Sequence, residues 1–271
     1  MRARQRAGPC GSVRFDLVTQ DLSWLRRAPG GPPTIIAHRG ASKAAPENTL
    51  AAFRTAIEQG ARLVECDVHL SADGVPVVMH DDRLDRTTDG SGAIAERTLA
   101  ELKTLDAGAW FGDVFRAERV PTLAEALDLC AGRARLVVEL KRGGGEALVA
   151  ASLAEIDQRA CDVAVISFGP EEVRAVARRR PDLPLGFLVT RQTVAEHGVD
   201  RLLSGARELG AGFFSPQESA VDDELVAAAR TADVPLSVWT VDDTARMRAL
   251  AQLGVDAITT NVPDVALRTF S

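Results

Sequence analysis

The sequence predicts an α/β fold, a (β/α)8 TIM barrel with a hairpin-containing insertion after the second strand. Short β-branched runs alternate with longer segments of helical period, the runs number eight, and one segment after the second run breaks the alternation. We expect the strands at residues 34–37, 62–67, 135–140, 163–167, 185–189, 212–215, 236–240 and 257–260. A doubly wound open sheet is the alternative, because counting strands does not establish closure of the sheet.

Segments of helical period fill the intervals between these strands. We expect helices at residues 49–59, 123–129, 145–159, 170–179, 200–209, 222–231 and 244–253. Two of them begin at recognisable caps. Thr122 is followed three residues later by Glu125, which is the capping-box pattern, and Asp243 stands directly before Thr244.

The segment that breaks the alternation has strand-like pieces on either side of Asp73 and Gly74, a pair typical of a hairpin turn. The stretch that follows is rich in turn residues and predicts one short helix near residues 99–105. We therefore expect residues 68–120 to form an insertion within a single barrel domain, residues 32–271. Residues 1–31 are expected to be a loose N-terminal extension with one short amphipathic turn at residues 22–25.

Composition excludes several classes of protein. The chain is 46% hydrophobic and 26% charged, which is typical of a globular domain and not of a disordered chain. A net charge of -6 without any block of like charges argues against a nucleic-acid partner. No apolar run is long enough to insert stably into a membrane. Polar residues interrupt the N-terminal apolar stretches before a signal peptide can form, so we expect a cytoplasmic protein.

The four cysteines include no C-x-x-C pair and lie far apart in a chain long enough to fold without disulfides. We expect Cys10, Cys66, Cys130 and Cys161 to be reduced and mostly buried.

Charged residues gather where the first three expected strands end. The first strand leads into residues 38–40, His-Arg-Gly, the second contains Glu65 and Asp67, and Glu139 and Lys141 end the third. Within each of the last two pairs the spacing is two, so both side chains point to one face of their strand, here the barrel interior. Active sites of TIM barrels lie at the carboxyl ends of the strands. These charges are therefore expected to converge on one mouth.

Three carboxylates, Glu65, Asp67 and Glu139, would repel one another in a partly closed site unless a cation neutralised them. Ligation by oxygen alone favours one hard divalent ion, Mg²⁺ or Ca²⁺, over zinc. The alternative is a structural ion network in which these acids pair with Arg39 and Lys141. Beside a metal, the same two cations would make a pocket suited to a phosphate group.

Two of the four histidines flank this expected mouth. His38 ends the first strand, and His80 ends the hairpin with Asp81 next to it as an orienting partner. A pair of imidazoles on either side of a phosphorus centre can remove one proton and deliver another. His69, within the hairpin, and His197, in a polar loop, are assigned no such role.

An ordered series of motifs connects these residues. It comprises His38-Arg39-Gly40, Pro46-Glu47-Asn48-Thr49, Glu65-Cys66-Asp67-Val68, the stretch from Asp73 to Asp81, Leu84 to Gly92, Pro121 to Leu127, Glu139-Leu140-Lys141, Trp239-Thr240-Val241 and Gly254 to Asn261. This series closely resembles the glycerophosphodiester phosphodiesterase family, over roughly residues 34 to 265.

The resemblance implies a TIM barrel that hydrolyses glycerophosphodiesters, small-molecule substrates, to sn-glycerol 3-phosphate and an alcohol, as part of lipid and glycerol metabolism. It also implies site roles: His38 and His80 as the acid and base, Glu65, Asp67 and Glu139 as metal ligands, Arg39 and Lys141 as phosphate contacts, and Glu47 and Asn48 as supports. Capping of the helix at residues 49–59 is an equally good interpretation of Glu47 and Asn48.

The apolar residues bear on substrate range. Trp239 is expected to pack against the glycerol unit, with Phe111, Phe115, Phe168, Phe213 and Phe214 as candidates for an apolar wall, although Phe213 and Phe214 suit the core better. Two alternative functions follow. A lysophospholipase D-type enzyme acting on lipid headgroups would use an exposed rim of Trp110, Phe111 and Phe115, and a non-catalytic phosphodiester-binding barrel would bind without turnover. The sequence determines neither the leaving alcohol nor the oligomeric state.

Overall fold

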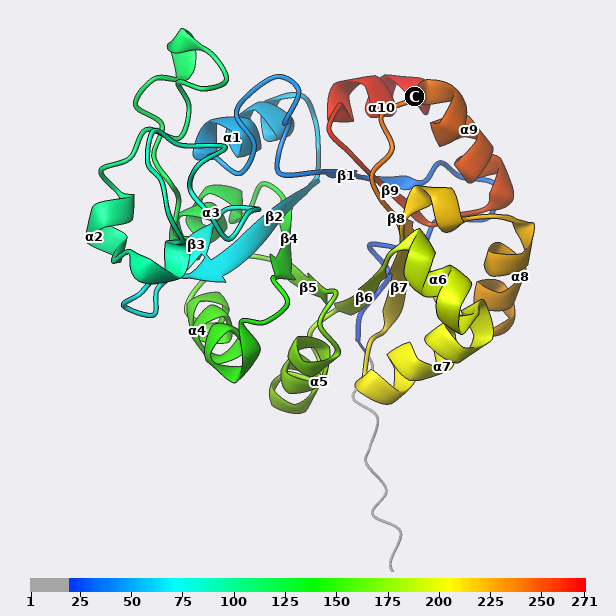
Figure 1. Ribbon diagram of the computed structural model, residues 1–271. Helices are drawn as coiled ribbons and strands as arrows, with labels where there is room; N and C mark the ends of the chain where they lie inside the picture. Colours follow the sequence, from blue (N-terminus) through cyan, green and yellow to red (C-terminus); the bar gives the residue numbers. More distant parts are fainter. Residues whose placement is uncertain (1–19) are drawn as a thin grey trace, which may run out of the picture.

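The computed structural model describes residues 20–271 and confirms the barrel (Figure 1). Its parallel strands are β1 (Thr34–Ala37), β2 (Leu63–Leu70), β4 (Arg135–Leu140), β5 (Val163–Ser167), β6 (Leu185–Val189), β7 (Phe213–Pro216), β8 (Ser237–Val238) and β9 (Ala257–Thr260). They are hydrogen-bonded in the order β7-β6-β5-β4-β2-β1-β9-β8. Isolated parallel bridges, Phe214 with Leu236 and Gln217 with Trp239, join β7 to β8 and close the circle. The open-sheet alternative is therefore wrong.

All seven expected helices are present around the barrel (Figure 1). They are α1 (Leu50–Glu58), α3 (Leu123–Cys130), α4 (Gly145–Asp157), α5 (Pro170–Arg179), α7 (Val199–Leu209), α8 (Asp223–Thr231) and α9 (Thr244–Leu253). Thr122 and Asp243 cap α3 and α9 as predicted, each accepting a hydrogen bond from a backbone amide in the first helical turn. The sequence did not predict α6 (Arg191–His197) or α10 (Pro263–Thr269). Helix α6 buries none of its residues, so it has no apolar stripe to detect.

The insertion begins where β2 runs beyond the barrel and pairs with the antiparallel strand β3 (Pro76–Val78), with Val68 opposite Val78. Gly74 makes the turn with φ at 78°. The rest contains the 3-10 turns η1 (Ile94–Glu96) and η2 (Asp113–Phe115) and the short helix α2 (Leu99–Leu102). These pieces enclose a small apolar core of their own: Val77, Met79, Leu84, Ile94, Leu102, Ala107 and Val120. Figure 1 shows the insertion at one side of the barrel, next to α1 and α3.

Residues 20–31 are not the loose extension that the sequence predicts. Leu25 is completely buried and belongs to the apolar cluster inside the barrel, together with Ile36, Val137 and Phe213. The sequence gives no sign of this packing because the partner of Leu25 is a space between strands that come later in the chain. The other part of the predicted extension, residues 1–19 with Cys10, lies outside the described residues. Of the remaining cysteines, Cys66 and Cys130 are buried and Cys161 is half-buried, all as free thiols.

Candidate active site

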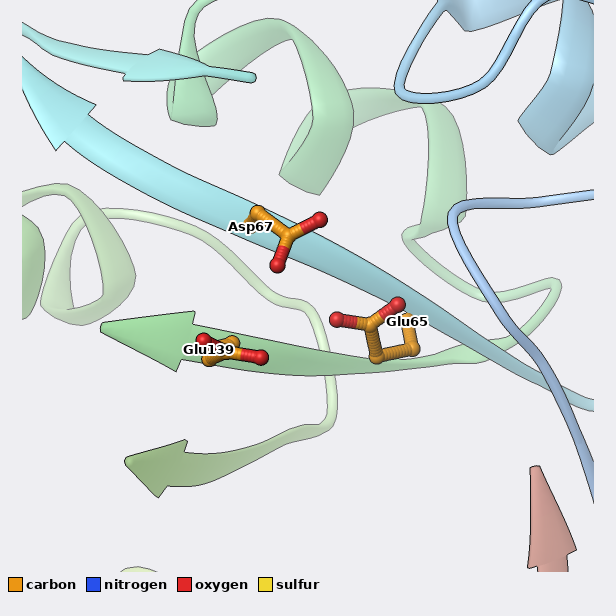
Figure 2. A group of neighbouring side chains, drawn as sticks. All are labelled: Glu65, Asp67 and Glu139. Atoms are coloured by element: carbon orange, nitrogen blue, oxygen red, sulfur yellow. The ribbon is translucent and has the colours of Figure 1, made fainter. Parts of the chain in front are cut away.

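Three carboxylates project from neighbouring strands into the barrel (Figure 2). Strands β2 and β4 run in register with Asp67 opposite Glu139, and Glu65 lies two residues before Asp67 on the same face. Each residue offers an oxygen within 4.8 Å of the others, and all three are buried. The i, i+2 spacing in the sequence therefore identified a real cluster.

The charges of this cluster are unevenly balanced. Burial, reinforced by the negative charges of Asp67 and Glu139, raises the pKa of Glu65 well above its ordinary value. Burial and the charge of Asp67 raise the pKa of Glu139 to about 7. Burial would also raise the pKa of Asp67, but the positive charges of Lys141 and Arg39 outweigh that effect and hold it well below the usual range. Without a bound cation, two of the three acids resist ionisation.

The residues fit a divalent metal. Oε2 of Glu65 accepts a hydrogen bond from the Arg39 amide at 2.8 Å, whereas its buried Oε1 has no hydrogen-bond partner among the described residues. A buried carboxylate oxygen without a partner, beside two more carboxylates, is the environment that a hard cation satisfies. All three ligands are oxygens, which suits Mg²⁺ or Ca²⁺.

Lys141 and Arg39 lie against the same carboxylates. Lys141 Nζ is 2.5 Å from Oδ1 of Asp67 and 2.7 Å from Oε1 of Glu139, and Arg39 Nε is 3.3 Å from Oδ2 of Asp67. The ion pairs of the structural-network alternative thus form. They do not account for the whole cluster, because Oε1 of Glu65 remains without a partner.

A strained turn places Arg39 over this cluster. Arg39 itself has φ at 55°, which is rare outside glycine, and Gly40 follows with φ at 83°. A Cβ on Gly40 would lie 2.5 Å from the carbonyl carbon of Ala52 in α1, so the turn can pack against the helix only with glycine there. The turn directs the Arg39 amide at Glu65 and the side chain at Asp67.

His38 comes from the end of β1, and a neutral amide holds its ring. Its Nδ1 lies 2.7 Å from Oδ1 of Asn261, whose Nδ2 donates to Asp242 at 2.8 Å. Because that amide oxygen can only accept, Nδ1 carries the proton and Nε2 is left with a free lone pair. Burial, with the charge of Arg39, lowers the pKa of His38 to about 4. The ring is therefore neutral at pH 7.

His80 is held by a charged chain instead. Its Nδ1 lies 2.7 Å from Oδ1 of Asp81, and Arg86 donates to Asp81 through Nε at 2.7 Å. The other side of the Arg86 guanidinium donates to Glu47 at 2.8 and 2.9 Å, and Glu47 accepts from Arg39 at 2.8 Å. Three side chains, Asp81, Arg86 and Glu47, thus connect the His80 ring to Arg39. Burial, the largest effect, lowers the pKa of His80, although Asp67 and Asp81 oppose it.

Asn48 is directed at the carboxylates and does not cap α1. Its Nδ2 donates to Oδ2 of Asp67 at 2.8 Å, and its Oδ1 accepts from the Asp67 amide at 3.2 Å. The cap of α1 is Thr49, whose hydroxyl accepts from the Ala52 amide. The capping interpretation of Glu47 and Asn48 is therefore wrong.

A cavity of about 150 Å³ extends from these residues into the barrel and includes His38, Arg39, Glu65, His80 and Glu139 in its lining. Of the predicted apolar wall, Phe168, Phe213 and Trp239 also line it. Trp239 meets Phe168 edge-to-face at 5.3 Å between ring centroids. Phe214 lies in the core outside the barrel interior, and Phe111 and Phe115 meet edge-to-face in the insertion without lining the cavity.

Sequence reasoning overlooked three residues that support the histidines. Arg86, Asp242 and Asn261 orient side chains without pointing to any chemistry of their own. Arg86 and Asn261 do fall within the motif series, which was the only signal available. Of the two histidines that were assigned no role, His69 bonds the backbone carbonyl of His80 at 3.1 Å and His197 ends α6.

Comparison with known proteins identifies the family. Residues 38–265 match the Glycerophosphoryl diester phosphodiesterase family. The chain belongs to this family of phosphodiester hydrolases. It is 37% identical to a glycerophosphodiester phosphodiesterase of Caldanaerobacter subterraneus subsp. tengcongensis, over 86% of this chain and 96% of that protein. It is 33% identical to one of Bacillus subtilis, over 85% of this chain and 84% of that protein.

Solved structures of family members have the same fold. An Oleispira antarctica phosphodiesterase in complex with the product sn-glycerol-3-phosphate superposes with a TM-score of 0.82 at 34% identity, covering 88% of this chain and 96% of that one. A putative glycerophosphoryl diester phosphodiesterase of Silicibacter pomeroyi matches with a TM-score of 0.82 at 31% identity, covering 92% and 96%. Among the described residues of this family member, no helix has both the length and the apolar character needed to cross a membrane.

Proposed function

We propose that this chain hydrolyses glycerophosphodiesters to sn-glycerol 3-phosphate and an alcohol, with one divalent cation and two histidines. One observation carries the proposal: a single cavity holds two imidazoles, each with its Nδ1 engaged, beside three clustered carboxylates and two cations. Family membership and the product bound to the Oleispira relative support the choice of substrate.

Glu65, Asp67 and Glu139 would hold the metal, Mg²⁺ or Ca²⁺. When bound, such an ion stabilises charge on a phosphate oxygen and lowers the pKa of a nearby hydroxyl. Arg39 and Lys141 bind the remaining phosphate oxygens. Both lie within 3.3 Å of Asp67, so they can turn from the carboxylates to the phosphate with little movement.

The hydrogen-bond partners of the two histidines indicate which ring acts as the base and which as the acid. His38, neutral and bonded to an amide through Nδ1, presents Nε2 as the base that takes the proton of the attacking hydroxyl. His80, bonded to the Asp81 carboxylate, delivers its Nε2 proton to the departing alcohol oxygen, and Asp81 and Asp67 partly offset the lowering of its pKa by burial. Each ring thus uses one nitrogen for orientation and the other for chemistry.

The attacking group is the glycerol hydroxyl adjacent to the phosphate. A bond forms between that oxygen and phosphorus, the bond to the alcohol breaks, and a cyclic phosphate results. Water then opens the ring while the histidines exchange roles, which restores both protonation states. A cyclic phosphate in rapid-quench samples would support this route, and its absence at every time point would favour direct attack by water.

Release of sn-glycerol 3-phosphate from glycerophosphocholine and glycerophosphoethanolamine tests the proposal. We expect product with the purified chain, none in EDTA, and recovery when Mg²⁺ or Ca²⁺ is added back. His38→Ala and His80→Ala should each lower kcat by about 10²–10⁴, the usual contribution of an acid or base. Wild-type turnover in either variant would remove that histidine from the mechanism.

One observation favours a second candidate, hydrolysis of lysolipid headgroups. Trp110 and Val114, in the insertion, are the exposed large hydrophobic residues of the described chain, at 41% and 88%. Co-sedimentation with lysophosphatidylcholine-containing vesicles, lost in Trp110→Ala, would support that candidate.

A further inference from the structure

The described chain begins with a segment that packs against the amino ends of the barrel strands. Gln20 donates to the carbonyl of Gly210 at 2.9 Å and accepts from the backbone at the start of β6 at 3.0 Å. Arg27 donates to the carbonyl of Ala251 in α9 at 2.8 Å. In Figure 1 the segment is the blue stretch of chain without regular structure that enters beside β6 and β7. We call residues 20–27 the floor segment. It lies outside the residues that match the family.

The barrel has room for this segment because its strands supply small residues there. Ala164, Gly186 and Ala257 take positions where a TIM barrel usually carries branched side chains. A Cβ on Gly186 would lie 2.3 Å from the ring of Phe213, so this position cannot fill the space itself. The ring of Phe213 fills the space beside Gly186, and Leu25 is completely buried in the same cluster, with Ala164 and Ala257. The floor segment thus replaces part of an interior layer that the strands leave incomplete.

Trp24 is the residue of the floor segment that reaches the catalytic cavity. Its ring meets Phe213 edge-to-face at 6.0 Å and lies under the guanidinium of Arg135 at 4.9 Å. The cavity lined by His38 and Glu65 is also lined by Trp24. The cavity therefore runs from the metal-ligand candidates at the mouth to an indole ring at the opposite end of the barrel.

The walls between these ends differ in polarity. Val137 and Ile166 make an apolar side on β4 and β5, and across the barrel Ser237 and Thr259 place hydroxyl-bearing side chains on β8 and β9. A polyol has a carbon chain and a row of hydroxyls, which such walls complement. The glycerol unit is common to all glycerophosphodiesters whereas the alcohol varies, so the closed inner end suits glycerol and the mouth suits the alcohol.

We propose that the floor segment closes the inner end of the catalytic cavity and that Trp24 is a specificity-determining residue, which limits the group bound there to about the size of glycerol. The identity of that group rests on the proposed function. Trp24 touches no reacting atom in this scheme. It sets the depth available to the half of the substrate that stays attached to phosphate.

The test compares two substrates in the full chain, glycerophosphocholine and its 1-O-propyl derivative. The quantity measured is the ratio of their kcat/KM values. In Trp24→Ala this ratio should shift in favour of the propyl substrate by about tenfold or more, since each added methylene in an apolar site is worth about tenfold or more. Trp24→Phe should shift it less. Added indole should restore the wild-type ratio in Trp24→Ala by refilling the space.

Arg26→Ala is the matched control. Arg26 lies in the same segment, pairs with Asp233 at 2.9 Å, and does not line the cavity. We expect it to leave the ratio unchanged whatever it does to the melting temperature. An unchanged ratio in both Trp24 variants, or an equal shift in Arg26→Ala, would overturn the proposal. If Trp24→Ala fails to fold, Trp24→Phe decides.

A binding measurement separates this proposal from the proposed function. Calorimetry should show one indole bound per chain of metal-free Trp24→Ala, and none bound to the wild type or to Arg26→Ala. If the wild type hydrolyses neither substrate, the proposed function is wrong, and indole binding alone then tests whether Trp24 closes the inner end of the cavity. Failure of Trp24→Ala to bind indole would then also reject the proposal that the floor segment closes the cavity.

Discussion

The Nδ1 atom of His38 lies 2.7 Å from Oδ1 of Asn261, so an uncharged amide determines which ring nitrogen of His38 bears the proton. His80 has the carboxylate of Asp81 in the corresponding place, also at 2.7 Å. Two imidazoles that face one cavity therefore have partners of different charge, and a single substitution can give both of them a carboxylate partner.

Asn261→Asp should move the acidic limb of the pH–rate profile. Burial lowers the pKa of His38 to about 4, so in the wild type this base keeps its lone pair as pH falls until about 4. A carboxylate beside Nδ1 favours the imidazolium and raises that pKa, so activity should be lost at a higher pH. The profile of kcat/KM from pH 4 to 9 checks this. Identical acidic limbs in the two proteins would show that protonation of His38 does not limit turnover.

Metal binding should release protons and strengthen with pH. Glu65 and Glu139 have raised pKa values, that of Glu139 about 7, and a cation binds only their ionised forms. Calorimetric titration with Ca²⁺ in two buffers of different ionisation enthalpy should report proton release near pH 6.5, and the affinity should weaken below about pH 7. Glu139→Gln should reduce both the affinity and the proton release.

The same groups give a stability prediction with a definite sign. A carboxyl whose pKa is raised by folding stabilises the folded chain below its unfolded pKa, and that contribution is lost as pH rises through the folded pKa. For Glu139 the window runs from its ordinary value of 4.5 up to about 7. The melting temperature in EDTA should therefore decrease across this window relative to Glu139→Gln. Added Ca²⁺ should raise it more at pH 8 than at pH 6.

Arg86→Ala should lower kcat by about 10–100-fold, the usual cost of losing an outer partner of a functional group. The change removes four hydrogen bonds to Asp81 and Glu47 and releases His80 from Arg39. Arg83→Ala is the control, because Arg83 pairs with Asp85 in the same loop at 3.2 Å without reaching the histidine. Arg86→Lys should recover little activity, since an ammonium cannot engage both carboxylates as a fork. Equal losses in Arg86→Ala and Arg83→Ala would indicate loop disruption only.

Gly40→Ala should destabilise the fold by more than about 1 kcal/mol, because the added Cβ combines a left-handed backbone with a clash. The clash is with the carbonyl carbon of Ala52 at 2.5 Å. Gly74→Ala is the control: Gly74 has φ at 78° but nothing within 4 Å of its Cβ position, so it carries the backbone cost alone. Urea denaturation of both variants separates the two terms.

The strand ends explain why so much of the site could be predicted. The spacing of two between Glu65 and Asp67 predicts that both side chains lie on one face of their strand. A parallel barrel brings the ends of β1, β2 and β4 together at one rim. Only the pattern of alternation was needed. The number of strands did not establish closure of the barrel, which the bridges between β7 and β8 show.

The remaining features depend on pairings that no local pattern encodes. Arg86 meets Glu47 across 39 residues, and Asn261 meets His38 across 223. The prediction for residues 20–31 was wrong for a related reason: the floor segment packs where the barrel has small residues, and a Cβ on Gly212 would lie 2.3 Å from Oε1 of Gln20. A sequence shows a large side chain more readily than the absence of one.

The two histidines belong to separately packed parts of the molecule. His38 directly follows barrel strand β1, whereas His80 follows Met79, which is buried in the small core of the insertion with Ile94. The separation of the imidazoles therefore depends on how the insertion packs against the barrel, including the pairing of β3 with β2 and the hydrogen bond from the Met79 amide to the Asp67 carbonyl at 3.0 Å. A substitution that repacks the core around Ile94 would therefore move His80 relative to His38 while Glu65, Asp67 and Glu139 stay in place.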